Sequence, residues 1–272
     1  MKELINIDLN QRIPIAVSSS IDKQLMVCSH ERSGNHFLMN TIGNTTDYCC
    51  DPWLNYDYNP LGGLNFFYEK NVSNFIKSLA KIKSNGREGC NASILKSHFP
   101  LSHLGSTAYE LPLKIIYIYR DPAEDFLSYW QILHRWDWNE GPKTKTPCEL
   151  ISLPPSGQSQ RYQLTNHKDY FERWALHTLD GINSCEANPN ACHISYKNLA
   201  KNHQKETRRL CKSLDIEIRR EVRLPSRTTN VIQGKSLPIS ADEIKNLEEV
   251  CNARLKNIPE LLKYFHDPIL DN

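Results

Sequence analysis

Four short apolar runs, separated by helical patterns, constrain the fold of this chain more than any other feature of its sequence. Each run is bounded by polar or turn-forming residues, and the runs are Leu25 to Ser29, Ala92 to Lys96, Leu113 to Tyr119 and Cys192 to Tyr196. Near-continuous hydrophobicity of this length is typical of strands that are covered on both faces. Because helical patterns lie between these runs, we expect an α/β fold of three layers, in which helices flank a mainly parallel central sheet.

Helices are predicted where apolar residues recur with helical spacing. They cover Asn35 to Ile42, Pro122 to Trp136, Asp169 to Cys185, His203 to Leu214 and residues 241 to 265. Asp121 is suited to cap the second of these helices, with Pro122 at its first position. Ser240 and Glu243 have the spacing of a capping box at the start of the last helix.

Length and charge favour a single globular domain with a local binding site. The 272 residues are enough for one substantial core and few for two, so we expect one domain over residues 1–272. The chain has 33 Lys and Arg against 31 Asp and Glu, a formal net charge of +2. Near-neutrality argues against nucleic acid as a partner, so any anion site must be local.

The sequence also carries expectations about compartment and metals. No apolar run approaches the ~18 residues of a transmembrane segment, and residues 1–10 lack the pattern of a signal peptide. The nine cysteines are scattered and contain no C-x-x-C pair. This pattern favours reduced thiols over a zinc site, and we expect a cytoplasmic protein.

Two long stretches interrupt the alternation of strands and helices, residues 52–68 and 137–166. The first is rich in aromatic residues, Asn and Gly, and the second in Pro, Thr, Ser and Gly. Connections this long in a compact domain are usually lids or substrate loops, or else are disordered. The aromatic residues of the first stretch are equally consistent with an acceptor pocket and with core packing.

A turn rich in anion-binding groups follows the first predicted strand. Arg32, Ser33 and Gly34 stand there, directly before the helix that begins at Asn35. Backbone N–H groups at a helix start have no internal partner and bind anions, while Gly34 lets the backbone approach closely and Arg32 adds a positive fork. The Gly-x-x-x-x-Gly-Lys-Ser/Thr pattern of nucleotide kinases is absent. Taken alone, the segment is equally consistent with an ordinary strand-to-helix turn.

A second candidate anion site follows the third predicted strand. Arg120 lies at the carboxyl end of that strand, the edge at which open α/β sheets bind ligands. Ser128 lies eight residues later, just over two helical turns, and so on roughly the same face as Arg120. An Arg and a Ser together can clamp a phosphate dianion. The alternative is that Arg120 pairs with a neighbouring carboxylate and Ser128 is a small packing residue.

A candidate general base ends the second predicted strand. Lys96 and His98 are two residues apart, so their side chains point to the same face of an extended chain. Histidine is the side chain best suited to accept a proton near neutral pH, and Lys96 would stabilise charge on a transferring group. A lone histidine is usually structural or solvated, and the position between two anion sites distinguishes His98.

Together these segments resemble the sulfotransferase family that uses 3′-phosphoadenosine-5′-phosphosulfate (PAPS). Arg32 to Phe37 is similar to the family's 5′-phosphosulfate loop, Lys-Ser-Gly-Thr-Thr-Trp. Arg120 and Ser128 resemble its 3′-phosphate motif, and Lys96 to Pro100 resembles the Lys-Thr-His-Leu-Pro segment that carries the catalytic His. Ser195 to Leu199 resembles its Tyr-Glu-Asp-Leu segment.

The first loop departs from the family pattern at four positions. Arg32 stands where the family often has Lys, which exchanges a compact donor for a planar fork. Asn35 and His36 replace two threonines, which removes hydroxyl donors to the phosphosulfate but keeps the backbone N–H groups. Phe37 replaces a Trp that stacks on adenine and keeps an aromatic face.

The resemblance extends over roughly residues 25–240, with its motifs in the family's order. It implies that Tyr196 contacts the adenine, and that the family's late Arg-Lys-Gly segment has its counterpart in Arg227 or in Gly234 and Lys235. It also implies the P-loop-like nucleotide-binding fold of the family, and no metal.

The implied reaction is in-line transfer of a sulfuryl group from PAPS to a hydroxyl or amine, with 3′-phosphoadenosine-5′-phosphate (PAP) as product. His98 would act as base, and Arg32 and Lys96 would stabilise the developing charge. The acceptor would be a small molecule, a lipid or a carbohydrate, and the sequence does not specify which. Two alternatives stay open: a small-molecule or nucleotide kinase that uses ATP, and a nucleotide-binding module without chemistry.

Overall fold

A parallel sheet forms the centre of the fold. The computed structural model describes residues 4–6, 14–17, 24–55, 82–83, 92–104, 113–136, 139–225 and 237–265. Within them lies a five-stranded sheet in the order β4-β6-β3-β7-β8, and every neighbouring pair is parallel. Its strands are β3 (Gln24–Cys28), β4 (Tyr48–Asn55), β6 (Ala92–Ser97), β7 (Leu113–Tyr119) and β8 (Ala191–Ser195). The four predicted strands and their parallel arrangement are confirmed.

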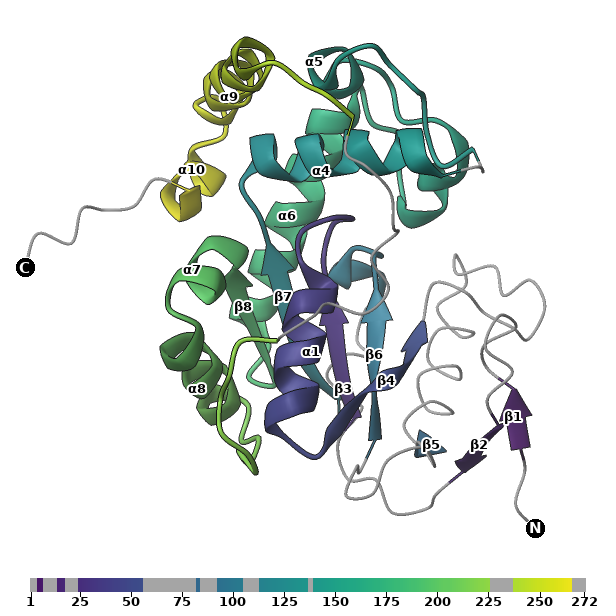
Figure 1. Ribbon diagram of the computed structural model, residues 1–272, viewed down its shortest axis with the longest axis vertical. Coiled ribbons are helices and arrows are strands. Elements are labelled where there is room, and N and C mark those ends of the chain that lie inside the picture. The colour runs from purple at the N-terminus through teal and green to yellow at the C-terminus, as the bar shows by residue number, and fades with distance from the viewer. Residues whose placement is uncertain are drawn as a thin grey trace, which may run out of the picture.

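The central sheet is buried on both faces, which explains the apolar runs in the sequence. In β3, Leu25 and Val27 belong to one hydrophobic cluster, and Met26 and Cys28 belong to another. Successive side chains of a strand point to opposite faces, so both faces of this strand are covered. Figure 1 shows α1 in front of the sheet and α6 behind it. The fold therefore has the three layers expected for a strand pattern of this kind.

Helices from both halves of the chain build the two outer layers. The cluster with Leu25 includes residues of α1 (Asn35–Thr45) and α8 (His203–Ser213). The cluster with Met26 includes residues of α4 (Pro122–Arg135), α6 (Tyr170–Ala187) and α9 (Ala241–Leu255). The caps follow the sequence: Asp121 accepts hydrogen bonds from Ala123 N and Glu124 N, and Ser240 forms a capping box with Glu243.

The structure corrects two predicted boundaries. The predicted helix over 241–265 is two helices, α9 and α10 (Pro259–Phe265), because Pro259 has no N–H to continue a helix and begins a new one instead. The fourth strand ends at Ser195, where the Ser195 side chain caps α7 (Tyr196–Lys201) by accepting a hydrogen bond from Asn198 N at 3.5 Å. Tyr196 therefore lies on a helix and not on a strand.

The sequence analysis did not predict β4 or a small second sheet. β4 is the edge strand beside β6, and its register shifts between Cys49 and Leu54. Pro52 lies within this interval, and a proline is tolerated on edge strands and at bulges. The second sheet is antiparallel, in the order β1 (Leu4–Asn6), β2 (Pro14–Val17) and β5 (Ile82–Lys83). These strands are too short to give a recognisable pattern.

The stretch predicted as a loop over 137–166 contains helical turns where the structure describes it. They are α5 (Pro147–Ile151) and the 3₁₀ helix η2 (Gly157–Tyr162). Thr146 caps α5 by accepting a hydrogen bond from Glu149 N at 3.2 Å. Of the stretch 52–68, residues 52–55 belong to β4, and the rest lies outside the described residues.

The described part of the chain contains free thiols and no membrane span. Its buried cysteines include Cys28, Cys185 and Cys211, and burial raises the pKa of the Cys211 thiol to about 11. In these segments no helix is both long and apolar enough to cross a bilayer. Nor do their His, Cys, Asp and Glu residues form a group of three suited to a metal ion.

The order of the strands favours the carboxyl ends of β3 and β7 as the place for a ligand. These two strands are neighbours, but the chain leaves β3 towards β4 and leaves β7 towards β8, on the opposite side. Open α/β sheets bind ligands at such a change of direction. The predicted turn at residues 32–34 and Arg120 follow these two strand ends directly.

Candidate active site

The loop between β3 and α1 contains two residues in the left-handed region of backbone conformation. Arg32 and Gly34 both have positive φ, 71° and 111°. A Cβ at residue 34 would lie 2.4 Å from Tyr196 Cδ2, so Gly34 is required by backbone conformation and by space. Gly34 is also the N-cap of α1 and offers no side-chain cap. The first N–H groups of α1 therefore meet no capping side chain and suit an anion.

Asn35 carries polar atoms with no partner at this helix start. The residue is 4% exposed, yet neither Nδ2 nor Oδ1 of its side chain makes a hydrogen bond in the structure as described. Buried carboxamides are nearly always hydrogen-bonded, so this one has bonding capacity for a ligand. The loop thus offers a donor in place of one threonine hydroxyl of the family pattern.

Cations surround this loop. Burial, together with the positive charges of Lys96 and Arg32, lowers the pKa of His36 to about 3. Burial also lowers the pKa of the Arg32 guanidinium, with Asp125 opposing the shift and Arg120 adding to it. Two Arg and one Lys close enough to perturb their neighbours create a local positive field, which an anion would relieve.

The structure brings the two predicted anion sites together. Arg32 Nε donates a hydrogen bond to Ser128 Oγ at 3.1 Å, across 96 positions of sequence. Arg120 Nε pairs with Glu124 Oε2 at 2.9 Å on the exposed side of α4. The pairing of Arg120 with a neighbouring carboxylate, which the sequence left open, is therefore present, and Ser128 is directed at the first loop.

Tyr196 joins the first, second and fourth motifs. Its ring lies 5.7 Å from the ring of Phe37 in an edge-to-face arrangement, and the Arg120 guanidinium lies 4.6 Å from its ring centre. The same ring packs against Gly34. Residues that are far apart in the sequence thus form one aromatic and cationic surface beside the loop.

His98 has the geometry of a neutral base. It is 9% exposed, and its Nδ1 lies 3.0 Å from the carbonyl oxygen of Ser29. A carbonyl oxygen only accepts, so Nδ1 carries the proton and Nε2 is the nitrogen that can accept one. Burial holds the pKa of His98 well below its usual value, and the charge of Lys96 lowers it further while Glu31 opposes the shift.

A buried polar network lies under the loop, and sequence reasoning missed it. Ser33 Oγ donates to Asp125 Oδ2 at 2.5 Å, and His30 Nδ1 lies 3.2 Å from Asp125 Oδ1. Asp125 is completely buried on α4. The Ser33 hydroxyl, predicted to bind the donor, is therefore directed inwards and fixes the loop to α4.

The network continues into α6 through a buried ion pair. Arg173 Nη2 donates to Glu31 Oε1 at 2.6 Å, and Arg173 Nη1 lies 3.0 Å from His30 Nε2. Burial opposes the ionisation of Glu31, but the attraction and hydrogen bond of Arg173, together with the effects of His30 and His98, outweigh it and lower the carboxyl pKa. His177, also on α6, places Nε2 2.8 Å from the carbonyl oxygen of His98. A signal was present in the sequence, since Arg173 and His177 interrupt the apolar face of a core helix.

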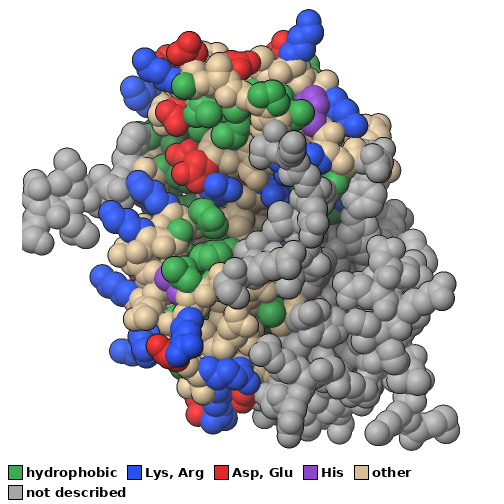
Figure 2. All heavy atoms as spheres, in the orientation of Figure 1, with side chains coloured by type: hydrophobic (Ala, Val, Ile, Leu, Met, Phe, Trp, Pro, Cys, Tyr) green, Lys and Arg blue, Asp and Glu red, His purple; other side chains and the backbone are tan. Residues whose placement is uncertain are grey.

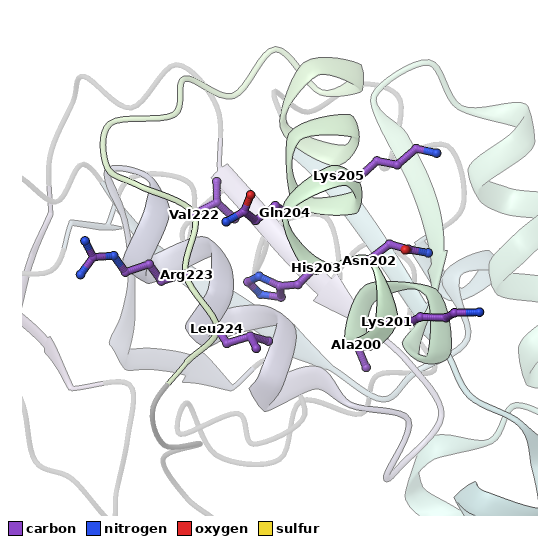
Figure 3. Close-up of a pocket in the computed structure, with 9 residues that line it drawn as sticks. All are labelled: Ala200, Lys201, Asn202, His203, Gln204, Lys205, Val222, Arg223 and Leu224. Carbon is purple, nitrogen blue, oxygen red and sulfur yellow. The ribbon is translucent and has the colours of Figure 1, made fainter.

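A cavity of about 520 Å³ opens beside Phe37, between the start of α8 and residues 222–224. Figure 3 shows the His203 ring between these segments, with Lys201 and Lys205 extending away from residues 222–224. The His203 ring lies 5.7 Å from that of Phe37, and its Nδ1 is buried without a hydrogen-bond partner in the described structure. The sequence gave no indication of His203, because its role depends on contact with α1.

The late basic residues lie outside this description. Arg227, Gly234 and Lys235 all fall in residues 226–236, which the structure does not describe. Their assignment to the 3′-phosphate stays a prediction.

The geometry has a counterpart among known protein families. The sulfotransferase domain family matches residues 22–249. The chain belongs to this sulfotransferase family. The match includes every described site residue above, from His30 to His203, and it confirms the family that the four motifs indicated. No curated protein sequence matches this sulfotransferase.

Solved structures that a structural comparison matches to this chain include sulfotransferases and a retinol dehydratase. Mouse sulfotransferase SULT7A1 complexed with PAP is 15% identical, with a TM-score of 0.47 over 86% of this chain and 66% of that one, just under two thirds. A retinol dehydratase in complex with retinol and PAP is 17% identical, with a TM-score of 0.42 over 90% and 71%. A sulfotransferase from Alicyclobacillus acidocaldarius is 14% identical, with a TM-score of 0.46 over 87% and 95%. The family assignment rests on the match over residues 22–249.

Proposed function

We propose that this sulfotransferase transfers a sulfuryl group from PAPS to a hydroxyl or amine of a small-molecule, lipid or carbohydrate acceptor. The observation that carries the proposal is the uncapped start of α1, where the unpartnered Asn35 carboxamide lies among cationic side chains. This is the environment that a buried phosphosulfate requires, because backbone dipoles and fixed cations replace its hydration.

Named residues of the loop fit the donor. PAPS would supply the activated sulfuryl group and a phosphate as leaving group. Arg32, Asn35 and the first N–H groups of α1 would hold the phosphosulfate, and Ser33 would hold the loop through Asp125. The match to the donor is chemical: the side-chain atoms that lack partners include a hydrogen-bond donor, Asn35 Nδ2, and Ser33, which already has a partner, fixes the backbone.

The other end of the donor is assigned to the surface around Tyr196. Arg120 and Ser128 would contact the 3′-phosphate, and Phe37 and Tyr196 would contact the adenine. The cavity lined by His203 and Leu224 extends this aromatic surface and would admit the edge of the base. Arg120 would exchange its pairing with Glu124 for the phosphate, which carries more charge and is bidentate.

His98 would accept the acceptor's proton at Nε2. Its neutral state at pH 7 and its fixed Nδ1 proton suit this role, and Lys96 beside it would stabilise negative charge as the sulfuryl group moves. The hydrogen bond from His177 to the His98 carbonyl would hold the backbone of the base in place. Positioning and electrostatics would then supply most of the catalysis, as in phosphoryl transfer.

Isothermal titration with PAP tests the proposal, with ATP and AMP as controls. We expect micromolar binding, about −8 kcal/mol, that requires the 3′-phosphate. Arg120→Ala should abolish it, whereas Arg208→Ala on the exposed face of α8 should not. Equal binding of ATP would favour the kinase alternative, and PAP binding without transfer to any acceptor would favour a non-catalytic module.

A further inference from the structure

A second cavity, of about 210 Å³, lies on the α6 side of the candidate base. Its walls come from the 3₁₀ helix η1 (Leu101–Leu104), from the middle of α6 and from residues 162–167. Pockets for drug-sized ligands are about 300–1,000 Å³, so this one suits a single small ring. None of the proposed donor-binding residues lines it, and of the four sequence motifs only Pro100 reaches its wall.

Three residues on the wall carry buried polar atoms without partners. They are Gln163 Oε1, His167 Nδ1 and Arg173 Nε, and none of them makes a hydrogen bond in the described structure. Gln163 is 8% exposed and Arg173 is 1% exposed. Unsatisfied atoms of this kind are uncommon, and all three belong to residues that line this one small cavity.

The hydrogen-bonding capacity of these three atoms indicates which chemical group would satisfy them. Arg173 Nε can only donate, Gln163 Oε1 can only accept, and His167 Nδ1 does either according to its tautomer. A carboxylate or sulfate only accepts and would leave Gln163 Oε1 unsatisfied. A hydroxyl accepts one hydrogen bond and donates another, and therefore matches both atoms.

The charges around the cavity also disfavour an anion. Arg173 is already paired with Glu31 at 2.6 Å, and Asp180 adds a carboxylate to the wall. Burial lowers the pKa of His167, and it lowers that of His177 to about 3, so both rings are neutral at pH 7. The cavity therefore has no unpaired cation among its described residues and favours a neutral ligand.

The rest of the wall is mainly apolar, although Ser102 and Thr165 also line it, and it leads to the base. Pro100, Leu164 and Leu176 line the cavity together with Tyr162. The Tyr162 ring lies 5.4 Å from the ring of His98. His177, another wall residue, donates to the His98 carbonyl oxygen at 2.8 Å. A ring held here would lie one side chain away from the candidate base, with an aromatic face beside it.

We propose that this cavity binds a neutral, hydroxyl-rich ring, such as a sugar or a cyclitol, as part of the acceptor. The role of the ring as part of the acceptor rests on the proposed sulfuryl transfer. The binding of the ring in the cavity does not depend on it. Hydroxyls of the ring bond to Gln163, His167 and Arg173, and its C–H face packs on Tyr162 and the aliphatic side chains.

Ligand-observed saturation-transfer NMR on the full chain, with PAP added, tests the binding. The probes are myo-inositol and methyl glucoside, with methyl glucuronide as the charged match of the glucoside and cyclohexanol as a ring with a single hydroxyl. We expect a millimolar dissociation constant for a neutral polyol and weaker binding of the two comparison compounds. Gln163→Leu and His167→Phe should each weaken it about 3- to 10-fold, whereas Gln158→Leu, the same change on exposed η2, should not.

Four outcomes overturn the binding proposal. They are no binding of either polyol, as for a cavity that holds only water; unchanged binding in both cavity variants; tighter binding of the glucuronide; and equal binding of cyclohexanol. A separate titration of the same sample with PAP reports on the proposed function, so the two failures are distinguishable. With labelled PAPS, Gln163→Leu should raise the KM for the polyol and leave kcat within about twofold, and a bound polyol that is never sulfated overturns its role as acceptor.

Discussion

The two sides of the loop at residues 30–35 differ in how their polar groups are satisfied. On the inner side, Ser33 and His30 bond to Asp125, and Glu31 pairs with Arg173. On the outer side, the Asn35 carboxamide makes no hydrogen bond in the described structure, and α1 begins without a side-chain cap. Residues of one short loop thus have opposite roles: the inner ones fix its shape, and the outer ones keep bonding capacity for an anion.

This difference separates residues that should bind the ligand from residues that should position the loop. Buried polar groups that are paired with one another contribute to a unique backbone, and a change there should act on stability and geometry. Groups with unmade bonds at a strained backbone should act on ligand affinity. Arg32 belongs to both groups. Its backbone has a positive φ of 71°, which shapes the loop, and its side chain reaches Ser128 on the outer side.

The largest effect is expected for the inner side. Arg173→Met should lower the free energy of unfolding by about 3–5 kcal/mol, because it leaves the Glu31 carboxylate buried without its partner. Urea denaturation followed by circular dichroism measures this change. The double variant Glu31→Gln, Arg173→Met should recover much of the loss, since neither charge is then unpaired. A loss below about 1 kcal/mol in Arg173→Met would mean that the ion pair does not hold the loop.

The same ion pair sets a pH dependence of stability. The pKa of Glu31 is lower in the folded protein than in the unfolded chain, where a glutamate has a pKa of about 4.3. The stabilisation is therefore complete above that pH and is lost as the pH falls through the lowered pKa of the folded state. Glu31→Gln should remove this part of the acid dependence.

Removing the base should have the next largest effect, on turnover alone. His98→Ala should reduce kcat by about 10²- to 10⁴-fold with PAP affinity retained, whereas His193→Ala, a half-buried histidine on β8, should change kcat little. Steady-state assays with labelled PAPS measure both. Near-normal turnover of His98→Ala would exclude it as the base.

The pH profile sharpens this assignment. A base must be neutral, and the pKa of His98 is held well below 6.5, so kcat should stay level as the pH falls to 6.5 and decline only below it. Lys96 is one of the charges that lower this pKa. Lys96→Met should therefore move the acid limb of the profile to higher pH, and a shift in the opposite direction would contradict the proximity of the two residues.

A pair of glycine variants separates binding from stability. Gly34→Ala should weaken PAP by at least about tenfold, because alanine resists a φ of 111° and its Cβ would lie 2.4 Å from the Tyr196 ring. Gly181→Ala places a Cβ 2.2 Å from Tyr117 in the core and should lower the unfolding midpoint instead. Titration and thermal unfolding of both variants test this, and equal PAP affinity in Gly34→Ala would contradict the assigned loop.

The smallest effect is expected for Ser128→Ala. It removes the hydrogen bond from Arg32 Nε and one predicted contact to the donor, so PAP affinity should fall by about 2- to 10-fold. Ser152→Ala, on an exposed position after α5, is the matched control. A loss above 100-fold would mean that Ser128 has a larger part in the site than these contacts indicate.

Surface charge gives an independent view of the acceptor. The basic residues Arg219, Arg220 and Arg223 pair with Asp47, Glu217 or Glu221. Figure 2 shows acidic side chains among the Lys and Arg on the face that it presents. Paired and interspersed charges of this kind do not form a track for a long polyanion, in agreement with a neutral ring as part of the acceptor.

The sequence by itself determined the layers of the fold, together with the helix cap and the glycine turn beside the candidate site. Apolar runs covered on both faces, Asp121 before Pro122, and Gly34 before a helix depend on neighbours within a few residues, so local patterns were enough to predict them.

Only the tertiary structure decided which residues meet on the inner side of the loop. Asp125 meets Ser33 across 92 positions and Arg173 meets Glu31 across 142, and no local pattern records such pairs. The same holds for the unsatisfied atoms of Gln163, His167 and Arg173 around one cavity, because a hydrogen bond that is not made is a property of the assembled packing.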